Sequence, residues 1–160
     1  MNVSEFRVSF NQDDEAISIM REAAQWLIET GKPLWAIENL TKDKLVKGQE
    51  DFLVGWIGNE SAASMILQWH DSFFWPNAKE NESGFIHKLS VRRKFAGSGI
   101  SEKMIKFAID ECKKRKISYL RLDCAGDREK LCSYYERIGF KQVAHKMIGK
   151  YDVALYELAI

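Results

Sequence analysis

The stretch RRKFAGSGIS, from Arg92 to Ser101, places three cations and two glycines beside the expected start of a helix. Backbone N–H groups in the first turn of a helix have no intrahelical acceptor and carry the positive end of the helix dipole. Gly97 and Gly99 lack a Cβ, so a ligand can approach the backbone there. The pattern therefore fits a phosphate-binding site and, equally well, a tight turn with solvated cations.

Two common nucleotide-binding motifs do not fit this loop. A P-loop requires G-x-x-x-x-G-K-[ST], and the sequence contains no such run. A dinucleotide-binding fingerprint requires a third glycine at position 102, where the chain has Glu102. A carboxylate there would face the pyrophosphate, which excludes this interpretation.

A second motif, YERIGF (Tyr135–Phe140), lies further along the chain. With the loop and the elements between them, the stretch from Leu89 to Val143 resembles the GNAT superfamily of N-acetyltransferases. In that family a strand ending in Val precedes a loop of the form [RQ]-x-x-G-x-[GA], which binds the pyrophosphate of acetyl-coenzyme A. A later helix carries "YE…GF". Two motifs at the correct spacing are more specific than either alone.

The resemblance implies a set of cofactor-binding residues. Ala96 stands where Arg or Gln is usual, Ser101 replaces the last Gly or Ala, and Arg128 stands where an Asn often begins the "YE" helix. We expect Arg92, Arg93 or Lys94 to compensate electrostatically for the contact that Ala96 cannot make. The predicted acetyl-coenzyme A site comprises Leu89, Val91, Ala96, Gly97, Ser98, Gly99, Ile100, Ser101 and Arg128.

The reaction that the resemblance implies is direct acetyl transfer from the thioester to a primary amine. Tyr135 is the predicted general acid that protonates the coenzyme A thiolate, although its position on an apolar helix face also fits a core aromatic. His87 titrates in the right range for a general base and lies on the cofactor side if its strand is bulged. His87 could equally be a structural residue with no role in catalysis. Glu82 and Asp71 are the alternative general bases, each acting through water. A chain of water molecules without a protein base would also suffice.

The acceptor is predicted to be a small-molecule amine or a peptide. It should bind beside the N-terminal helices and the loop at 72–83. The candidate walls are Trp26, Trp35, Trp69 and Trp75, each of which could instead fill the core. The alternative function is a non-catalytic acyl-coenzyme A binding or sensing protein of the same fold, and a weaker one is a nucleic-acid module using the basic loop. Proteins with the fold that the resemblance implies commonly pair through exposed strand edges, so a homodimer is compatible with it.

Bulk composition limits the function classes. The chain has 160 residues, a formal net charge of +1 and 46% hydrophobic residues, which predicts a single domain over 1–160 and argues against nucleic-acid or anionic-membrane binding. Cys112, Cys124 and Cys132 form no CxxC pair and are predicted to be reduced thiols without a metal. No secretory signal and no apolar run of about 20 residues is visible, so we expect a cytoplasmic protein.

Hydrophobic periodicity predicts the elements that position these residues. Their order, β-α-α-β-β-β-α-β-α-β-β, indicates an α/β fold with a mixed, mostly antiparallel sheet flanked by helices on both faces, as in GNAT proteins. The strands are expected at 5–10, 51–59, 61–69, 84–91, 117–125, 140–148 and 152–160. The helices are expected from Asp13 or Asp14 to Gly31, in short pieces over 34–49, and at 99–116 and 127–139.

Overall fold

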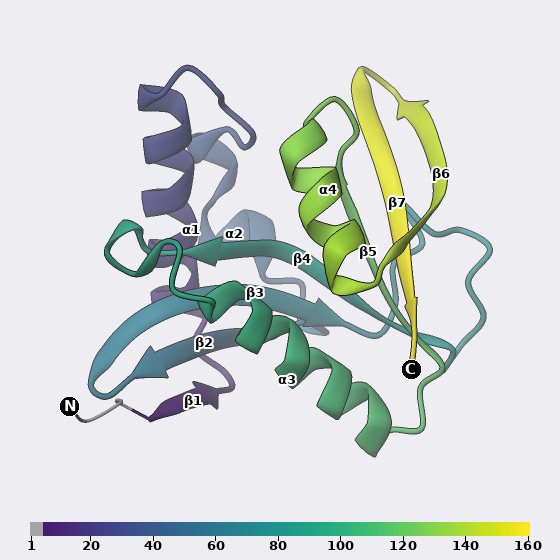
Figure 1. Cartoon of the computed structure of the whole chain (residues 1–160), viewed down its shortest axis with the longest axis horizontal. Coiled ribbons are helices and arrows are strands. Elements are labelled where there is room, and N and C mark those ends of the chain that lie inside the picture. The colour runs from purple at the N-terminus through teal and green to yellow at the C-terminus, as the bar shows by residue number, and fades with distance from the viewer. Residues whose placement is uncertain (1–4) are drawn as a thin grey trace. The chain divides into compact units, whose positions relative to one another are not determined.

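The computed structural model describes residues 5–160. Within these residues the strands and helices follow one another in the predicted order (Figure 1). The strands are β1 (Phe6–Ser9), β2 (Asp51–Ile57), β3 (Glu60–Gln68), β4 (Ser83–Val91), β5 (Tyr119–Ala125), β6 (Lys141–Ile148) and β7 (Tyr151–Ala159). The helices are α1 (Asp13–Glu29), α2 (Lys42–Leu45), α3 (Ile100–Lys114) and α4 (Glu129–Ile138), with short 3-10 turns η1 (Ile37–Asn39) and η2 (Arg93–Phe95).

The strands form one mixed sheet in the order β1-β2-β3-β4-β5-β7-β6. The β1–β2, β2–β3, β5–β7 and β6–β7 pairs are antiparallel. The β4–β5 pair is parallel, with Ser83–Ile86 beside Tyr119–Leu122, and α3 makes the crossover that a parallel pair requires. The predicted mixed, mostly antiparallel sheet is confirmed.

The described chain forms two compact units. The first comprises residues 5–67 and 88–107, and the second comprises residues 68–87 and 108–160. Each unit draws on two separate stretches of sequence, so no single cut in the chain divides them. No helix among the described residues is both long and apolar enough to cross a membrane.

In the first unit, helices pack on both faces of β2. Phe52 and Val54 belong to the same hydrophobic cluster as the apolar stripe of α1. Gly55 points to the opposite face, where an added Cβ would lie 2.7 Å from the Met104 sulfur of α3. Successive side chains of a strand alternate between faces, so the two helices cover opposite sides of this strand. The expected arrangement of helices on both faces is therefore present in this unit.

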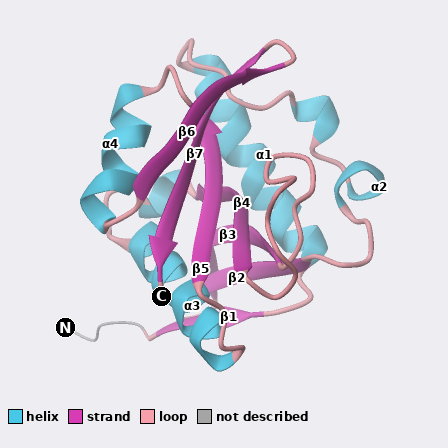
Figure 2. Ribbon diagram, turned by 90° about the vertical axis from the view of Figure 1, so that its right-hand side faces the viewer, coloured by secondary structure: helices cyan, strands magenta, loops and turns pink. Residues whose placement is uncertain are grey.

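In the second unit, β5 has two chemically different faces. Cys124 points toward α4, where its sulfur lies 3.9 Å from that of Cys132. Arg121 and Asp123 point to the other face, where Arg121 stacks on Trp75 of the loop between β3 and β4 and Asp123 pairs with His87 of β4. β6 and β7 form a hairpin on the outer side of this unit, in which β6 is mostly exposed (Figure 2).

Candidate active site

The predicted anion-binding loop lies in the first unit, between η2 and α3. Gly97 has a φ of 75° and Gly99 a φ of 81°, a left-handed backbone that glycine adopts without a steric penalty. Among the described residues, no atom beyond the glycine and its two chain neighbours lies within 4 Å of where a Cβ would stand on Gly97 or Gly99, so the backbone is open on that side. Within the described part of the chain, no carbonyl accepts the N–H groups of Gly97, Gly99 or Ile100. These donors, at the start of a 15-residue helix, can bind an anion.

The side chain of Arg92 does not face this loop as a free cation. Its guanidinium pairs with Glu15 at 2.8 Å and Glu22 at 2.9 Å, both on α1. It also donates to the carbonyl and hydroxyl of Ser61 at 3.1 Å. Arg92 thus connects the end of β4 to α1 and β3. This role could not be predicted from the sequence, because the partners of Arg92 lie far from it along the chain.

The two neighbouring cations are also engaged. Arg93 stacks on the indole of Trp26, with its guanidinium carbon 3.6 Å from the ring centroid. Lys94 forms an ion pair with Glu60. These contacts engage the side chains but leave their positive charges in place, so the predicted electrostatic compensation for Ala96 stays a prediction. The backbone N–H groups are the donors that the loop offers.

The end of β4 is irregular next to the predicted cofactor strand. Lys88 has a φ of 53°, an uncommon left-handed conformation for a residue with a side chain. It separates His87 from Leu89 and Val91, so the simple alternation of faces is broken there. The prediction that His87 lies on the cofactor side of the sheet assumed an irregular strand, and β4 is irregular at this point. The cofactor contacts of Leu89 and Val91 stay predictions.

Tyr135 lies in the second unit, on α4. The residue is 8% exposed, and its ring contacts those of Tyr134, Phe140 and Tyr156 at centroid distances of 5.3, 5.8 and 6.3 Å. Burial raises the pKa of its hydroxyl well above the usual range, so the group is protonated at neutral pH. No described residue hydrogen-bonds the hydroxyl. Tyr135 is thus a packed aromatic whose protonated hydroxyl has no described acceptor, which fits both interpretations of its motif.

The other residues of YERIGF are structural. Glu136 accepts a 2.6 Å hydrogen bond from the buried hydroxyl of Tyr156 on β7. Gly139 ends α4 with a φ of 120°, and Phe140 is 2% exposed in the core. The motif therefore fixes α4 against the sheet and so positions Tyr135.

Tyr156 was not singled out from the sequence, although a Tyr at the centre of the apolar run DVALYELAI is a signal for a buried hydroxyl that needs a partner.

Arg128 lies at the N-cap of α4. Its N–H donates to the carbonyl of Ala125 at 3.2 Å, and its own carbonyl accepts from Cys132 at 3.0 Å. Its side chain makes no cap hydrogen bond to the helix. The Arg therefore does not replace the capping function that an Asn would serve, and its predicted contact with the cofactor stays a prediction.

His87 occupies the centre of a charged cluster in the second unit. Its Nε2 lies 3.2 Å from Asp71 and its Nδ1 lies 3.2 Å from Asp123. All three side chains are largely buried, with 16%, 6% and 21% exposure for His87, Asp71 and Asp123. One candidate ligand atom from each residue lies within 4.8 Å of the others, close enough for a shared cation.

The protonation state of His87 bears on its predicted role as a general base. Burial by itself lowers its pKa, but Asp123 and Asp71 more than offset this and raise the pKa to about 9. The ring is then an imidazolium at neutral pH, with both nitrogens protonated, so it has no lone pair for an incoming proton. The raised pKa therefore disfavours proton uptake by His87, and its role as a general base stays a prediction.

Glu82, another candidate base, is also engaged. The backbone N–H of Lys79 and the guanidinium of Arg121 lower its pKa, which disfavours proton uptake. Arg121 lies 3.1 Å from Glu82 and 2.8 Å from Glu157.

Of the four predicted tryptophan walls, Trp75 lines a cavity, described below. Cations stack on the others: Arg93 on Trp26, Lys88 on Trp35 and Arg115 on Trp69.

The structure thus groups the predicted site residues in two places. The loop residues Ala96–Ser101, with Leu89 and Val91, belong to the first unit, while Tyr135, His87 and Arg128 belong to the second. A mixed sheet with an open glycine loop leading into α3, followed by a "YE…GF" helix, defines an acetyltransferase fold. The comparisons with known proteins agree.

The chain belongs to the acetyltransferase (GNAT) family, whose sequence model matches residues 12–140. A Bacillus subtilis (strain 168) protein named "Uncharacterized N-acetyltransferase YesJ" is 29% identical over 147 residues, covering 81% of this chain and 77% of that protein. A GNAT-family acetyltransferase from Listeria monocytogenes 4b F2365 is 25% identical, with a TM-score of 0.74 and coverage of 97% and 95% of the two chains. A Bacillus subtilis acetyltransferase solved in complex with CoA shares the fold at 14% identity, with a TM-score of 0.66 and coverage of 98% and 99%. The resemblance found in the two motifs is confirmed.

Proposed function

We propose that this acetyltransferase moves an acetyl group from acetyl-coenzyme A directly to a primary amine of a small molecule or peptide. The observation that carries the proposal is the loop of the first unit. Gly97, Gly99 and Ile100 present N–H groups without backbone acceptors at the start of α3, in the motif that binds the cofactor pyrophosphate in the family.

The residues present fit this cofactor. The open side of Gly97 and Gly99 leaves room for a phosphate against the backbone, and a Cβ at either position would occupy it. The loop N–H groups would hold the pyrophosphate, and the strand edge at Leu89–Val91 would bind the pantetheine arm as an added strand. When bound, acetyl-coenzyme A supplies an activated acetyl thioester.

Tyr135 is the proposed general acid. The phenol is protonated at neutral pH even at the ordinary pKa of a tyrosine, and no described residue accepts its proton. Burial raises the pKa and so makes the phenol a weaker acid, and the proposal rests on the free hydroxyl and its place in the motif. A free phenol can therefore donate to a leaving thiolate. The amine must be neutral before it attacks, and His87 cannot take its proton while its own pKa is about 9. We therefore propose that water removes this proton.

The test is a binding and turnover experiment with the intact chain. We expect acetyl-coenzyme A and coenzyme A to raise the melting temperature clearly, ATP to raise it less, and a panel of primary amines to give acetylated product detectable by mass spectrometry. No shift at millimolar ligand would refute the cofactor site. Binding without turnover on any amine would favour the alternative, a protein that senses acyl-coenzyme A.

A further inference from the structure

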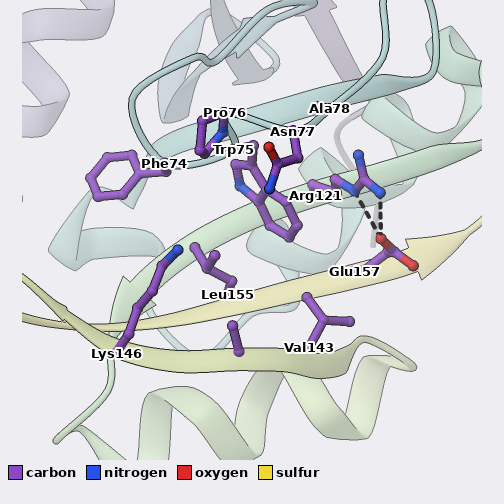
Figure 3. A pocket seen from close by; sticks show the side chains of 11 residues that line it. Phe74, Trp75, Pro76, Asn77, Ala78, Arg121, Val143, Lys146, Leu155 and Glu157 are labelled. Atoms are coloured by element: carbon purple, nitrogen blue, oxygen red, sulfur yellow. Dashed lines mark hydrogen bonds and ion pairs between the residues drawn. The ribbon is translucent and has the colours of Figure 1, made fainter.

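The second unit contains a cavity of about 330 Å³ beside the loop at 72–83, and none of the proposed cofactor-binding residues lines it. Phe74, Trp75 and Pro76 of the β3–β4 loop form one wall, and Val143 of β6 and Leu155 of β7 form the other (Figure 3). All five side chains are apolar or aromatic. A concave site with apolar walls and a few polar groups is the usual form of a small-molecule site, and roughly 300–1,000 Å³ is its usual volume.

The guanidinium of Arg121 in the cavity is already paired with two carboxylates. The Nε of Arg121 donates to Glu157 at 2.8 Å, and the same guanidinium donates to Ser83 at 2.7 Å and to Glu82 at 3.1 Å. Arg121 also stacks on the indole of Trp75, 4.8 Å from the ring centroid. The guanidinium therefore has little capacity left for a ligand and serves to support the aromatic wall.

Two hydrogen-bond donors at the cavity are unused. Lys146 lines it from β6, extends toward the loop in Figure 3, and pairs with no carboxylate of the described residues. The indole N–H of Trp75 is buried and has no acceptor among the described residues. The side chain of Asn77, which also lines the cavity, offers both a donor and an acceptor, and the indole N–H of Trp75 is closed to solvent. Lys146 is thus the lining charge without a partner among the described residues, so the complementary group on a ligand is an anion that accepts hydrogen bonds.

We propose that this cavity binds a small carboxylate with an aromatic or branched apolar body, with its carboxylate against Lys146. The body would lie between the loop aromatics and the apolar side chains of Val143 and Leu155. A small inorganic anion fits less well, because it would leave the apolar walls in contact with water. This proposal does not rest on the acetyl-transfer function.

The loop wall is held in place before a ligand arrives. Asp71 accepts the backbone N–H of Phe74 at 3.1 Å and also pairs with His87, which Asp123 holds from the other side. The ring centroid of Phe74 lies 6.4 Å from that of His87. A preformed wall lowers the ordering cost of binding.

The first test compares three probes by isothermal titration calorimetry: 3-phenylpropionate, 3-phenylpropan-1-ol and 3-phenylpropylamine. Because an exposed ion pair contributes roughly 0.2–1 kcal/mol, we expect the carboxylate to bind about two- to fivefold tighter than the alcohol, and the amine to bind weakest. Equal binding of all three, or no binding of the carboxylate, would overturn the proposal.

Surface variants locate the site. Lys146→Glu should weaken 3-phenylpropionate binding at least tenfold, whereas Lys150→Glu, with the same charge change in the β6–β7 turn, should not. Val143→Asp should have a similar effect, and Met147→Asp on the same strand should have none. Val143 and Met147 are 49% and 63% exposed, so these variants should fold, which a thermal melt checks. Equal losses in a variant and its control would overturn the assignment.

Discussion

The hydroxyl of Tyr156 donates a 2.6 Å hydrogen bond to Glu136, and this bond joins β7 to α4 across the core of the second unit. Tyr156 has 0% exposure, so its hydroxyl depends on a partner within the protein. Burial, followed by the Glu136 carboxylate, raises its pKa far above the usual range and keeps it a donor. The Glu of the "YE" motif therefore has a structural function, which is to hold the helix that carries Tyr135.

Tyr156→Phe should destabilise the protein. The substitution removes the donor and leaves the Glu136 carboxylate without it, which typically costs about 1–3 kcal/mol. Urea unfolding followed by circular dichroism measures the change. Tyr151→Phe is the matched control, because Tyr151 is 59% exposed and should change the free energy of unfolding by less than about 0.5 kcal/mol. Equal stability of the two variants would show that the hydrogen bond is unimportant.

Gly99→Ala should weaken cofactor binding beyond its effect on folding. A φ of 81° is strained for alanine, and the added methyl would stand in the open space before the loop. We expect a loss of about 1–2 kcal/mol in stability and at least a tenfold loss in coenzyme A affinity.

Gly149→Ala provides the control for this backbone strain. Gly149 has a φ of 61°, also has nothing within 4 Å of a Cβ, and lies in the β6–β7 turn, outside the predicted cofactor motif. The Gly149→Ala variant should lose about as much free energy of unfolding as the Gly99→Ala variant and should keep the wild-type affinity for coenzyme A. If both variants lose affinity equally, the loop is an ordinary turn.

The elements of this fold could be predicted from the sequence because their signals are local. Alternation at 5–10 and short apolar or β-branched runs further along the chain identified the strands, and the apolar stripe with Gly139 at its end identified α4. The side-chain partners could not be predicted, because they depend on strand register and on contacts between distant segments. Arg92 carried no sign in its own surroundings that Glu15 and Glu22 of α1 would pair with it.

The same limit applied to the charged cluster. His87 was selected by its residue type and its strand, but its role depends on Asp71 from a loop and Asp123 from a parallel neighbour strand. Either carboxylate alone would leave one ring nitrogen free. With both present the ring is held as an imidazolium, and the predicted base becomes a cation.

Arg92→Met should destabilise the first unit. It leaves the carboxylates of Glu15 and Glu22, which are 36% and 40% exposed, without their shared cation. Partial solvation limits the cost to about 1–3 kcal/mol by urea unfolding. Arg92→Lys should fall between the wild type and this variant, because an ammonium keeps the charge but cannot reach both carboxylates with a planar fork. A lysine variant as unstable as the methionine variant would contradict the ion-pair explanation.

Tyr135→Phe should lower kcat without lowering stability. No described residue bonds the hydroxyl, so its removal should change the free energy of unfolding by less than about 0.5 kcal/mol and leave coenzyme A affinity unchanged. If the phenol protonates the thiolate, kcat should fall about 10²-fold, at the lower end for general acid catalysis. An unchanged kcat with any amine that the enzyme acetylates would assign Tyr135 to packing alone.

The stability of the protein should fall as pH rises above neutrality, because of His87. Its pKa is about 9 in the folded protein, against an ordinary value of 6.5 in the unfolded chain. The folded state therefore holds this proton more tightly, so the stabilisation is complete below pH 6.5 and is lost as pH rises through 9. Between pH 6.5 and 8.5 the expected loss is about 2 kcal/mol. Urea unfolding at several pH values measures this loss.

His87→Gln, which carries no such proton, should show a nearly flat profile of stability against pH over this range. His145→Gln, at a site with 48% exposure, should keep the wild-type slope. Parallel profiles for the wild type and His87→Gln would mean that the two carboxylates do not hold the ring as an imidazolium.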